Sequence, residues 1–321
     1  MNCLCCGKPI KSDASAYNGW HKTCIRRFFG TSKMPEINIS NETLELLAAE
    51  TTNKGYTVPG VQKKLSLHLS MEEKARLTLV GYPSGYILKP QTPEYRALPE
   101  AEQMVMCMAD AVGISTVPHG LIASNGTYAY ITKRVDRQAG PDQSVRLLAM
   151  EDFCQLTYRL TADKYQSSYE RCAKVIDRWS SQKGLDMTEF FIRVVFSFLV
   201  GNSDMHLKNF SLIETAPGTQ SYKLSPAYDM LPVNIISEDT EETALALNGK
   251  KTRLRRKDFM ALAAACQLPA VAAEKMIARL IAKKDVMMRI AATSQAPEDI
   301  RQECMDLIEK RTHVFMQQTS R

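Results

Sequence analysis

The chain has 321 residues, of which 45% are apolar and 24% charged, and its formal net charge is +6. These values exclude wholesale disorder, and the length is enough for two or three domains or for two lobes around a cleft. The most apolar stretch, residues 190–200, contains Arg193 and is too short to cross a bilayer. Because no secretory signal opens the chain, we expect a cytoplasmic protein with no membrane contact and mostly reduced cysteines.

The first 35 residues are rich in cysteine. Four metal-binding side chains occur there in two close pairs, spaced C-x2-C and H-x2-C: Cys3, Cys6, His21 and Cys24. Such a set suits tetrahedral Zn²⁺, and four protein ligands leave no open position, so the role of the metal would be structural. Cys5 is a spare thiol. The alternative is a reduced, metal-free cluster packed by Trp20 and Phe28.

Residues 36–140 predict a small β-rich lobe with one long helix. Apolar residues recur at helical spacing in 99–112, and a shorter helix is expected within 36–50. Alternating apolar residues and turn dipeptides predict one strand after residue 60 and two hairpins, the first over 75–90 and the second around Asn125-Gly126.

Residues 141–321 predict a larger helical lobe. Helices are expected over residues 150–160, 168–180, 188–200 and most of 255–316, with a short hairpin inside 205–231. The basic run KKTRLRRK at 250–257 is either a solvated helix start or a contact for phosphate or an acidic partner.

Four polar residues follow the helix expected at 188–200, in the stretch GNSDMHLKN. Asp204 and Asn209 are spaced D-x-x-x-x-N. At that offset, protein-kinase catalytic loops place a carboxylate at the substrate hydroxyl and an amide oxygen at Mg²⁺. Apolar flanks on both sides would hold such a loop still. A capped turn has the same spacing, so this pattern is weak by itself.

Phosphoryl transfer requires further groups, and the sequence offers candidates for them. Asp229, in SPAYDML, is a second carboxylate for the metal. Lys89, in the strand YILKP, is a cation for the phosphates, with Glu102 or, failing that, Glu100 on the next helix as its partner. Gly60 lies in a turn that could cover the triphosphate. Each of these residues, taken alone, is also common at strand ends, helix starts and turns.

Taken in order, these segments resemble the HipA family of bacterial serine/threonine kinase toxins over roughly residues 50–316. The nine residues GNSDMHLKN are close to the family motif G-N-[ST]-D-x-H-x-K-N, which makes them the most specific part of the match. The resemblance implies an α+β, two-lobed protein-kinase-like fold. The small β-rich N-lobe would comprise residues 36–140 and the larger helical C-lobe residues 141–321.

The resemblance also implies a role for each matching residue. Asp204 would be the catalytic base, and Asn209 and Asp229 would hold Mg²⁺. Lys89 would contact the α- and β-phosphates of ATP, with Glu102 fixing its position.

Other residues would line the nucleotide site by the same resemblance. His206 and Lys208 would lie beside the γ-phosphate or brace the loop. Arg134 and Asp136 match the hinge at adenine, although Val135 replaces the family's usual phenylalanine there. Gln155, in EDFCQ, is either near the nucleotide or a helix-surface amide. The glycine loop over the phosphates would consist of Gly60, Val61 and Gln62.

The activity implied is that of an ATP- and Mg²⁺-dependent serine/threonine kinase acting as the toxin of a type II toxin–antitoxin system. Its substrate would be a protein of translation, such as an aminoacyl-tRNA synthetase. We expect the chain to lack the N-terminal subdomain that usually precedes the glycine loop, as in the similar HipT kinases. The implied partners are a helix-turn-helix antitoxin and a small protein supplying that subdomain, with DNA bound only through the antitoxin.

A rival hypothesis from another class is a non-catalytic nucleic-acid-binding or regulatory protein. It would combine a zinc knuckle, the basic run at 250–257 and a degenerate kinase-like core. Such a protein would bind RNA or DNA in a salt-dependent way and would not turn over ATP. Against a degenerate core, all four residues expected for phosphoryl transfer are present: Lys89, Asp204, Asn209 and Asp229.

Kinases of this family can phosphorylate serines just before the G-V-Q of the glycine loop, where this chain reads Thr57-Val58-Pro59. Proline has no hydroxyl, so we predict that Thr57 is the one acceptor left in that motif, with Ser66 further along the strand. A phosphate there would repel the triphosphate of ATP. Phosphopeptide mass spectrometry after incubation with ATP tests this prediction, and unmodified Thr57 and Ser66 would contradict it.

Overall fold

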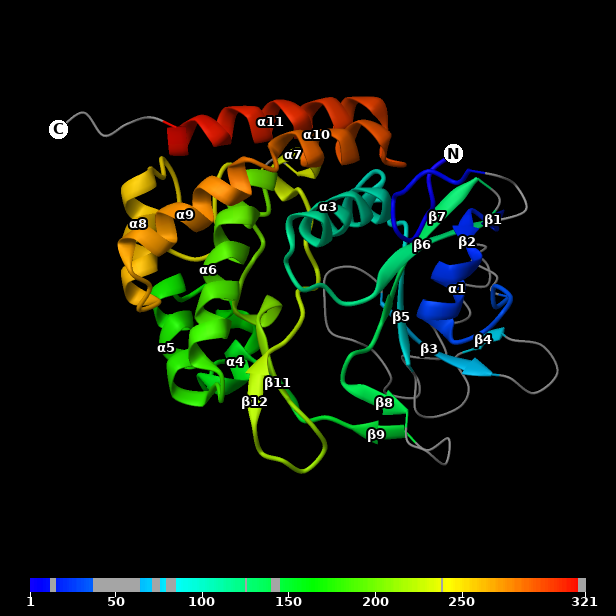
Figure 1. The fold of residues 1–321 in the computed structure, drawn as a ribbon, viewed down its shortest axis with the longest axis horizontal. Helices are drawn as coiled ribbons and strands as arrows, with labels where there is room; N and C mark the ends of the chain where they lie inside the picture. Colours follow the sequence, from blue (N-terminus) through cyan, green and yellow to red (C-terminus); the bar gives the residue numbers. More distant parts are fainter. Residues whose placement is uncertain are drawn as a thin grey trace. The chain divides into compact units, whose positions relative to one another are not determined.

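The computed structural model describes residues 1–11, 16–36, 64–70, 76–78, 85–124, 126–139, 145–237 and 239–316. Helices and antiparallel sheets are both present, and the chain separates into two compact units (Figure 1). Unit 1 comprises Met1–Cys107, Val117–Val135 and Thr293–Pro297, and unit 2 comprises Met108–Thr116, Asp136–Ala292 and Glu298–Arg321. The domain boundaries drawn from the sequence after residues 35 and 140 stay a prediction.

Unit 1 contains a five-stranded antiparallel sheet in the order β4-β3-β5-β7-β6 (Figure 1). Its strands are β3 (Leu65–Ser70), β4 (Arg76–Thr78), β5 (Tyr86–Pro90), β6 (His119–Ser124) and β7 (Thr127–Lys133). Apolar side chains such as Leu67, Leu88 and Ile131 are at most 1% exposed, so they form the core of the sheet. Burial of these side chains is the main source of the sheet's stability.

The pairing of these strands corrects the hairpin predicted over residues 75–90. β4 and β5 are not neighbours, because β3 lies between them in the sheet. Leu65 of β3 lies opposite Leu88 of β5, and Leu69 lies opposite Leu77 of β4. With six residues, β3 is long enough to pair with β5 over its first half and with β4 over its second half. A local pattern of apolar residues and turns cannot anticipate such an inserted strand.

The second predicted hairpin is confirmed, because β6 and β7 pair over their full length from His119↔Thr132 to Ser124↔Thr127. The long helix predicted over 99–112 is also confirmed as α3 (Leu98–Val112). Its buried side chains include Met104 and Val105, at 1% and 0% exposure. This helix carries Glu102, so its position determines where that carboxylate lies.

The N-terminal residues form a small element that packs on β6. It consists of β1 (Ala16–Tyr17), β2 (Trp20–His21) and α1 (Lys22–Phe29), shown in blue in Figure 1. Trp20 is fully buried, and its indole Nε1 donates a hydrogen bond to Leu121 O at 2.8 Å. A Cβ at Gly120 would lie 2.5 Å from the Trp20 ring, so only glycine allows β6 to approach this closely.

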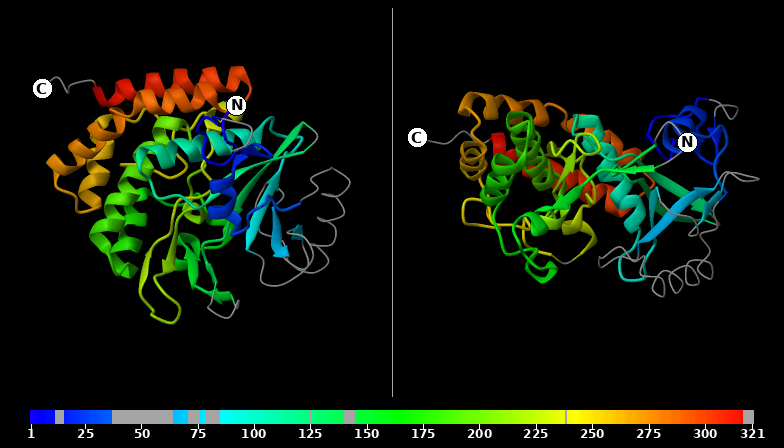
Figure 2. Two further views of the ribbon diagram at one scale, coloured as in Figure 1. Left: turned by 45° about the vertical axis from the view of Figure 1, so that its right-hand side comes forward. Right: turned by 90° about the horizontal axis from the view of Figure 1, so that it is seen from below.

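Unit 2 is mainly helical, as the sequence predicts. Its long helix α6 (Lys183–Val200) contacts four other helices: α5 (Tyr169–Trp179), α8 (Arg256–Ala265), α9 (Ala270–Ile281) and α11 (Glu298–Met316). Figure 2 gives two further views of the chain. The shorter helices are α4 (Phe153–Leu156), α7 (Val233–Ile236) and α10 (Lys284–Thr293), with 3-10 turns η2 (Thr161–Asp163) and η3 (Leu207–Asn209). Apolar faces of these helices form the core of the unit.

Two small sheets complete unit 2. A pair of strands, β8 (Arg137–Ala139) and β9 (Val145–Leu147), stands apart from a three-stranded sheet of β10 (Met150–Asp152), β11 (Ser211–Glu214) and β12 (Tyr222–Leu224). The pairing of β11 with β12 confirms the hairpin predicted inside 205–231. The helix predicted over 150–160 is wrong at both ends, because residues 150–152 pair with β11 as a strand and α4 ends at Leu156.

Several predicted features lie outside the described residues. They are the helix expected within 36–50 and the glycine-loop residues Thr57, Gly60, Val61 and Gln62. Ser66 is described, and it lies in β3, 9% exposed. Within the described ranges, no helix combines the length and apolar character that a bilayer span requires.

The buried His119, at the start of β6, should make the stability of the protein depend on pH. Burial lowers the pKa of its imidazole to about 4, and the positive charge of Arg27 adds to this effect. In the unfolded chain the pKa returns to about 6.5, so the unfolded state binds more protons between these values. This contribution to stability is complete above pH 6.5 and is lost as the pH falls towards 4. The difference is worth about 3 kcal/mol.

Urea unfolding of the wild type and of His119→Asn at pH 7, 6, 5 and 4 measures this contribution. Asparagine keeps an N–H donor near the position of Nδ1 but does not titrate. The free energy of unfolding should therefore fall more steeply with acidification in the wild type than in the variant. Other titrating groups are common to both proteins and cancel in the difference, so parallel curves would contradict the prediction.

Candidate active site

The loop after α6 carries the four polar residues singled out in the sequence. Helix α6 ends at Gly201, whose φ of 78° lies in the left-handed region. A Cβ at Gly201 would lie 2.6 Å from Leu307 Cδ2, so glycine serves both the turn and the close packing. The chain then passes through Asn202 and Ser203, both buried, before it reaches Asp204. The loop therefore begins at a fixed point on the helical core.

Asp204 is the exposed carboxylate of this loop, with 40% of its side chain accessible. Tyr165 donates a hydrogen bond from its hydroxyl to Asp204 Oδ1 at 2.5 Å. His206 Nε2 lies 3.9 Å from the same oxygen. The rings of Tyr165 and His206 meet edge to face, with centroids 5.0 Å apart. One carboxylate oxygen is thus held by neighbours.

Asn209 closes the loop from its other end. Its side-chain Nδ2 donates to the backbone oxygen of Asp204 at 2.8 Å, and its own N–H donates to His206 O at 3.0 Å. The residue is 4% exposed. Because the nitrogen of the amide is engaged, the orientation of the amide is fixed, and its Oδ1 accepts no hydrogen bond from any described residue. An amide oxygen held in this way is a suitable ligand for a hard cation.

Asp229, the second predicted carboxylate, lies close to this loop. Its charge acts on the imidazole of His206, as does that of Asp204. The backbone of Asp229 has φ of 59°, a left-handed conformation that non-glycine residues seldom adopt. Strained backbone of this kind concentrates at functional sites. Within unit 2, the charges of Asp204 and Asp229 thus both act on the ring of His206.

His206 is 5% exposed, and its environment keeps it neutral. Burial lowers the pKa of its imidazole, with a further contribution from Lys164, and this outweighs the opposing effect of Asp204 and Asp229. Its Nδ1 is buried without a hydrogen-bond partner among the described residues. A neutral ring packed against Tyr165 supports the loop without adding a positive charge to it.

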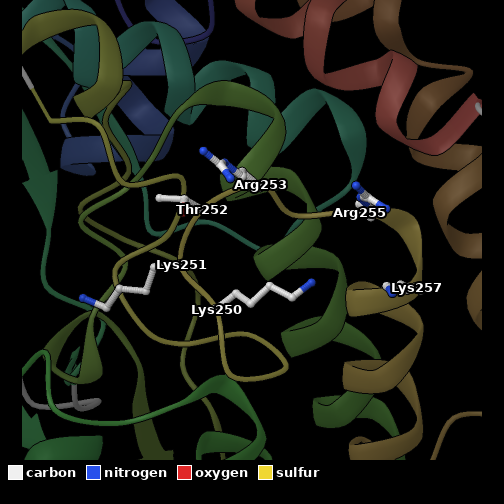
Figure 3. A pocket seen from close by; sticks show the side chains of 6 residues that line it. All are labelled: Lys250, Lys251, Thr252, Arg253, Arg255 and Lys257. Carbon is white, nitrogen blue, oxygen red and sulfur yellow. The ribbon is translucent and has the colours of Figure 1, made fainter.

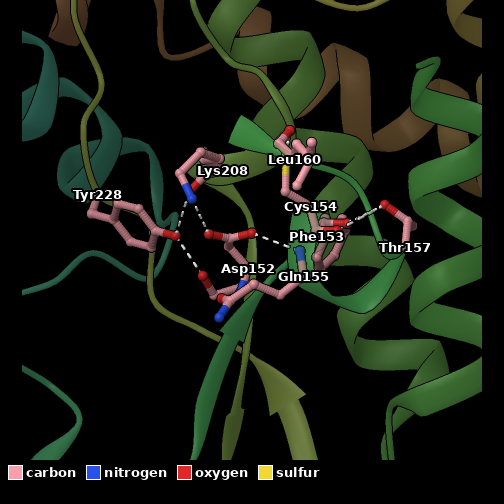
Figure 4. Close-up of polar contacts among 9 residues, drawn as sticks. Asp152, Phe153, Cys154, Gln155, Thr157, Leu160, Lys208 and Tyr228 are labelled. Carbon is pink, nitrogen blue, oxygen red and sulfur yellow. Dashed lines mark hydrogen bonds and ion pairs between the residues drawn. The ribbon is translucent and has the colours of Figure 1, made fainter. Parts of the chain in front are cut away.

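Lys208 contacts the end of strand β10 (Figure 4), and its role, beside the γ-phosphate or as a brace of the loop, stays a prediction. Its Nζ donates to Asp152 Oδ2 at 2.6 Å, and Tyr228 donates from its hydroxyl to Lys208 O at 3.0 Å. Asp152 also caps α4, accepting from the N–H of Gln155 at 3.0 Å, while Gln155 Oε1 accepts from Asp152 N–H at 2.9 Å. The structure therefore places Gln155 in a capping box.

Lys89 and Glu102 form a buried ion pair in unit 1. Lys89 Nζ lies 2.6 Å from Glu102 Oε1, and the two residues are 4% and 0% exposed. Lys89 is on β5 and Glu102 is on the first turns of α3, as the sequence predicts. Glu100, the other candidate partner, does not make this contact, and burial raises the pKa of its carboxyl. Protein kinases use a pair of this kind to position the lysine on ATP phosphates.

A layer of rings lies next to this ion pair. Lys89 Nζ is 5.3 Å from the centroid of the Tyr130 ring, a cation–π distance. The imidazole of His119 stacks on Tyr130 with centroids 6.3 Å apart and an interplanar angle of 13°. The buried ammonium is therefore stabilised by a carboxylate and by the face of an aromatic ring.

The two predicted hinge residues lie in different units, and each is described within its own. The backbone N–H of Arg134 donates to Gly85 O at 2.9 Å, which continues the pairing of β7 with β5. Asp136 Oδ2 pairs with Arg137 Nη1 at 2.7 Å, and Asp136 O accepts from Leu148 N–H. Their role at adenine stays a prediction.

The four predicted zinc ligands lie together in unit 1. One ligand atom from each of them lies within 4.8 Å of the others: Cys3, Cys6, His21 and Cys24. Cys5 is buried beside them but is outside this set. All nine cysteines of the chain are described, and each is a free thiol.

The basic run at 250–257 lines an open pocket of about 500 Å³ in unit 2 (Figure 3). Six residues line it: Lys250, Lys251, Thr252, Arg253, Arg255 and Lys257. Lys250 pairs with Asp258 at 2.9 Å, and Lys251 pairs with Glu241 at 2.9 Å. Neutralisation of these two lysines by the protein itself weakens the attraction of the pocket for an anion.

Some residues of the site were not anticipated from the sequence. Tyr165 occupies an irregular polar segment, DKYQSSY, with no periodic signal around it. Asp152 could have been found, because an aspartate followed three residues later by a glutamine is typical of a capping box. Its bond to Lys208, 56 residues away, depends on the tertiary structure alone.

The α+β fold, the Lys89–Glu102 ion pair and the loop with Asp204 and Asn209 are together typical of the class of kinase-like proteins. The sequence matches the HipA-like C-terminal domain over residues 56–288, more than half of the chain. The chain therefore belongs to the HipA-like family, and the resemblance stated from the sequence is confirmed.

Relatives in sequence carry kinase names. A Haemophilus influenzae protein named "Putative kinase" is 30% identical over 252 residues, 75% of this chain and 71% of that protein. "Putative kinase Y4mE" of Sinorhizobium fredii is 30% identical over 63% of this chain and 48% of its own length. The serine/threonine-protein kinase toxin HipA of Shewanella oneidensis is 24% identical over 60% of this chain and 46% of that toxin. The chain thus spans about half the length of the latter two relatives.

Two solved structures share the fold. The HipA of Shewanella oneidensis MR-1, solved with HipB and operator DNA, matches with a TM-score of 0.68 at 18% identity, covering 89% of this chain and 76% of that one. The Helicobacter pylori proinflammatory kinase CtkA matches with a TM-score of 0.54 at 16% identity, covering 81% and 91%. The two-lobed, kinase-like fold class predicted from the sequence is confirmed by these likenesses.

Gly201 generates a stability prediction for the start of the loop. Gly201→Ala adds a Cβ to a left-handed residue and brings it against Leu307, so we expect a loss of about 2–4 kcal/mol. Gly218→Ala is the matched control, because Gly218 has φ of 75° but nothing within 4 Å of its Cβ position. That variant should lose only about 1 kcal/mol. Equal losses of unfolding free energy in urea would show that packing against Leu307 is unimportant.

Proposed function

We propose that this protein is an ATP- and Mg²⁺-dependent serine/threonine-protein kinase. The observation that carries the proposal is the fixed loop in which Asn209 donates to the backbone of Asp204 at 2.8 Å while the Asp204 carboxylate stays 40% exposed. A general base has to be accessible to the hydroxyl that it deprotonates and rigid enough to be aimed at it. Asp204 meets both requirements.

Asp229 and the Oδ1 of Asn209 would hold the Mg²⁺ of the nucleotide. Both offer oxygen, the ligand type that Mg²⁺ requires, and Asn209 offers it in a fixed orientation. When bound, the metal would neutralise charge that develops on the transferring phosphoryl group. His206 is neutral and buried behind Asp204, so its role is to pack the loop.

Lys89 would contact the α- and β-phosphates. Its pairing with Glu102 and its contact with Tyr130 fix the direction of the ammonium group before ATP arrives. Arg134, Asp136 and the glycine-loop residues Gly60, Val61 and Gln62 would complete the nucleotide site. Lys208 acts through Asp152 and holds the catalytic loop in place.

By analogy with the family, the substrate would be a serine or threonine of a protein of translation, such as an aminoacyl-tRNA synthetase. The Shewanella HipA that shares the fold was solved with HipB and operator DNA. We therefore propose that this chain also acts as a toxin, bound by a helix-turn-helix antitoxin that contacts DNA. A small protein supplying an N-terminal subdomain would be a further partner.

The purified chain should hydrolyse ATP or phosphorylate itself or a bacterial extract in the presence of Mg²⁺. Asp204→Asn should reduce the rate by on the order of 10²–10⁴-fold, because it removes the base while keeping the hydrogen bond geometry of the loop. Lys89→Met should mainly weaken ATP binding. Phosphate transfer from radiolabelled ATP measures the first effect, and titration with a fluorescent ATP analogue measures the second.

Asp177→Asn is the matched control, because this aspartate of α5 is 47% exposed and contacts Lys183 and Gln267 at the surface. It should leave both measurements unchanged. The rival class, a non-catalytic nucleic-acid-binding protein, predicts the opposite pattern. If the wild type shows no transfer while it binds RNA or DNA with a steep salt dependence, the kinase proposal is wrong.

A further inference from the structure

We propose that Cys3, Cys6, His21 and Cys24 bind one structural Zn²⁺, and that the resulting knuckle holds helix α3 in place through Gln103, the neighbour of Glu102. The site would therefore act at a distance as a brace for the Lys89–Glu102 ion pair. The inference does not depend on the kinase activity proposed above, because every contact in it lies within unit 1.

The spacing of the four ligand atoms fits one tetrahedral ion. With Zn–S bonds of about 2.3 Å, ligand atoms around a tetrahedral centre lie about 3.8 Å apart. His21 Nδ1 is 3.5 Å from Cys6 Sγ and 3.8 Å from Cys24 Sγ, and all four ligand atoms are within 4.8 Å of one another. Cys3 and Cys24 are buried, so the site is shielded from water. A set of three thiols and one imidazole is typical of structural zinc.

The orientation of His21 is set for metal binding through Nδ1. Its other ring nitrogen, Nε2, lies 3.2 Å from Pro9 O and can donate to it. Carbonyl contacts of this kind select the tautomer with a free lone pair on Nδ1, as they do around known metal sites. The backbone N–H of His21 also donates to Cys3 Sγ at 3.3 Å, which favours a thiolate there. These contacts argue for ligation rather than for accidental crowding of thiols.

Gln103 connects the turn between Cys3 and Cys6 to helix α3. Its side-chain Nε2 donates to the backbone oxygens of both intervening residues, Leu4 at 3.2 Å and Cys5 at 2.9 Å. The amide is 6% exposed, so these bonds form away from water. Leu4 O also accepts from the N–H of Leu121, which ties the same turn to β6. The turn over residues 3–6, which zinc would fix, is therefore hydrogen-bonded to both α3 and β6.

The connection continues from Gln103 to the ion pair. Gln103 Oε1 accepts from Nδ1 of His119 at 2.7 Å, and His119 stacks on Tyr130, whose ring faces Lys89. Glu102 is adjacent to Gln103 on the helix, so both partners of the pair share this support. Without the metal, the four ligand side chains would lose the bonds that hold them to one centre, and the two carbonyl acceptors of Gln103 would lose their fixed positions.

The first experiment measures the metal. Protein expressed without an affinity tag and purified without added metal should contain one zinc per chain by plasma mass spectrometry. Cys24→Ser should reduce the content at least fivefold, as should Cys6→Ser, whereas Cys5→Ser should keep one zinc. A wild-type content below a tenth of an equivalent overturns the site. Loss of zinc from a folded Cys5→Ser protein overturns the ligand set.

The second experiment measures the brace by hydrogen exchange. Removal of zinc with a thiol-blocking mercurial and a chelator should speed amide exchange in residues 98–107 by about tenfold or more. Peptides from α11, in unit 2, are the internal control and should not change. Gln103→Leu should keep one zinc yet exchange faster over 98–107. If metal removal leaves α3 protected as in the wild type, the brace is wrong even where zinc is bound.

Discussion

A buried ammonium group is the feature around which unit 1 is organised. Lys89 is 4% exposed, and a charge removed from water in this way costs several kcal/mol unless it is paired. Glu102 supplies the opposite charge at 2.6 Å, and the face of Tyr130 supplies a further attraction. Strand β5 and helix α3 must consequently keep their mutual position, since a small displacement would leave both charges unpaired. The packing of His119 and Gln103 next to the pair follows from that requirement.

In unit 2 the key charged group, the Asp204 carboxylate, is exposed, in contrast to the buried Lys89 of unit 1. Asp204 stays accessible, and it is oriented by contacts from the exposed Tyr165 and from the buried Asn209. Gly201 allows the loop to leave α6 in a left-handed turn, and Asp229 adopts a left-handed backbone nearby. Fixed surroundings of this kind reduce the entropy that a reacting group loses on reaching its productive geometry.

Buried histidines in both units remain neutral for the same physical reason. Burial lowers the pKa of His119 and of His206, since water no longer solvates the charged form. Neither ring then adds positive charge next to Lys89 or Asp204. Lys89 and Asp204 are therefore each packed near an uncharged histidine ring.

The sequence by itself determined the local elements and the identities of the polar residues. Helical spacing predicted α3 and α6, and the motif GNSDMHLKN predicted the loop with Asp204 and Asn209, because short-range periodicity and spacing are properties of the chain. Only the tertiary structure decided that β3 separates β4 from β5, that Lys208 bonds to Asp152 and that Tyr165 bonds to Asp204. These contacts join residues that are far apart along the chain or lack any periodic signal, so they exist only once the hydrophobic cores have brought their elements together.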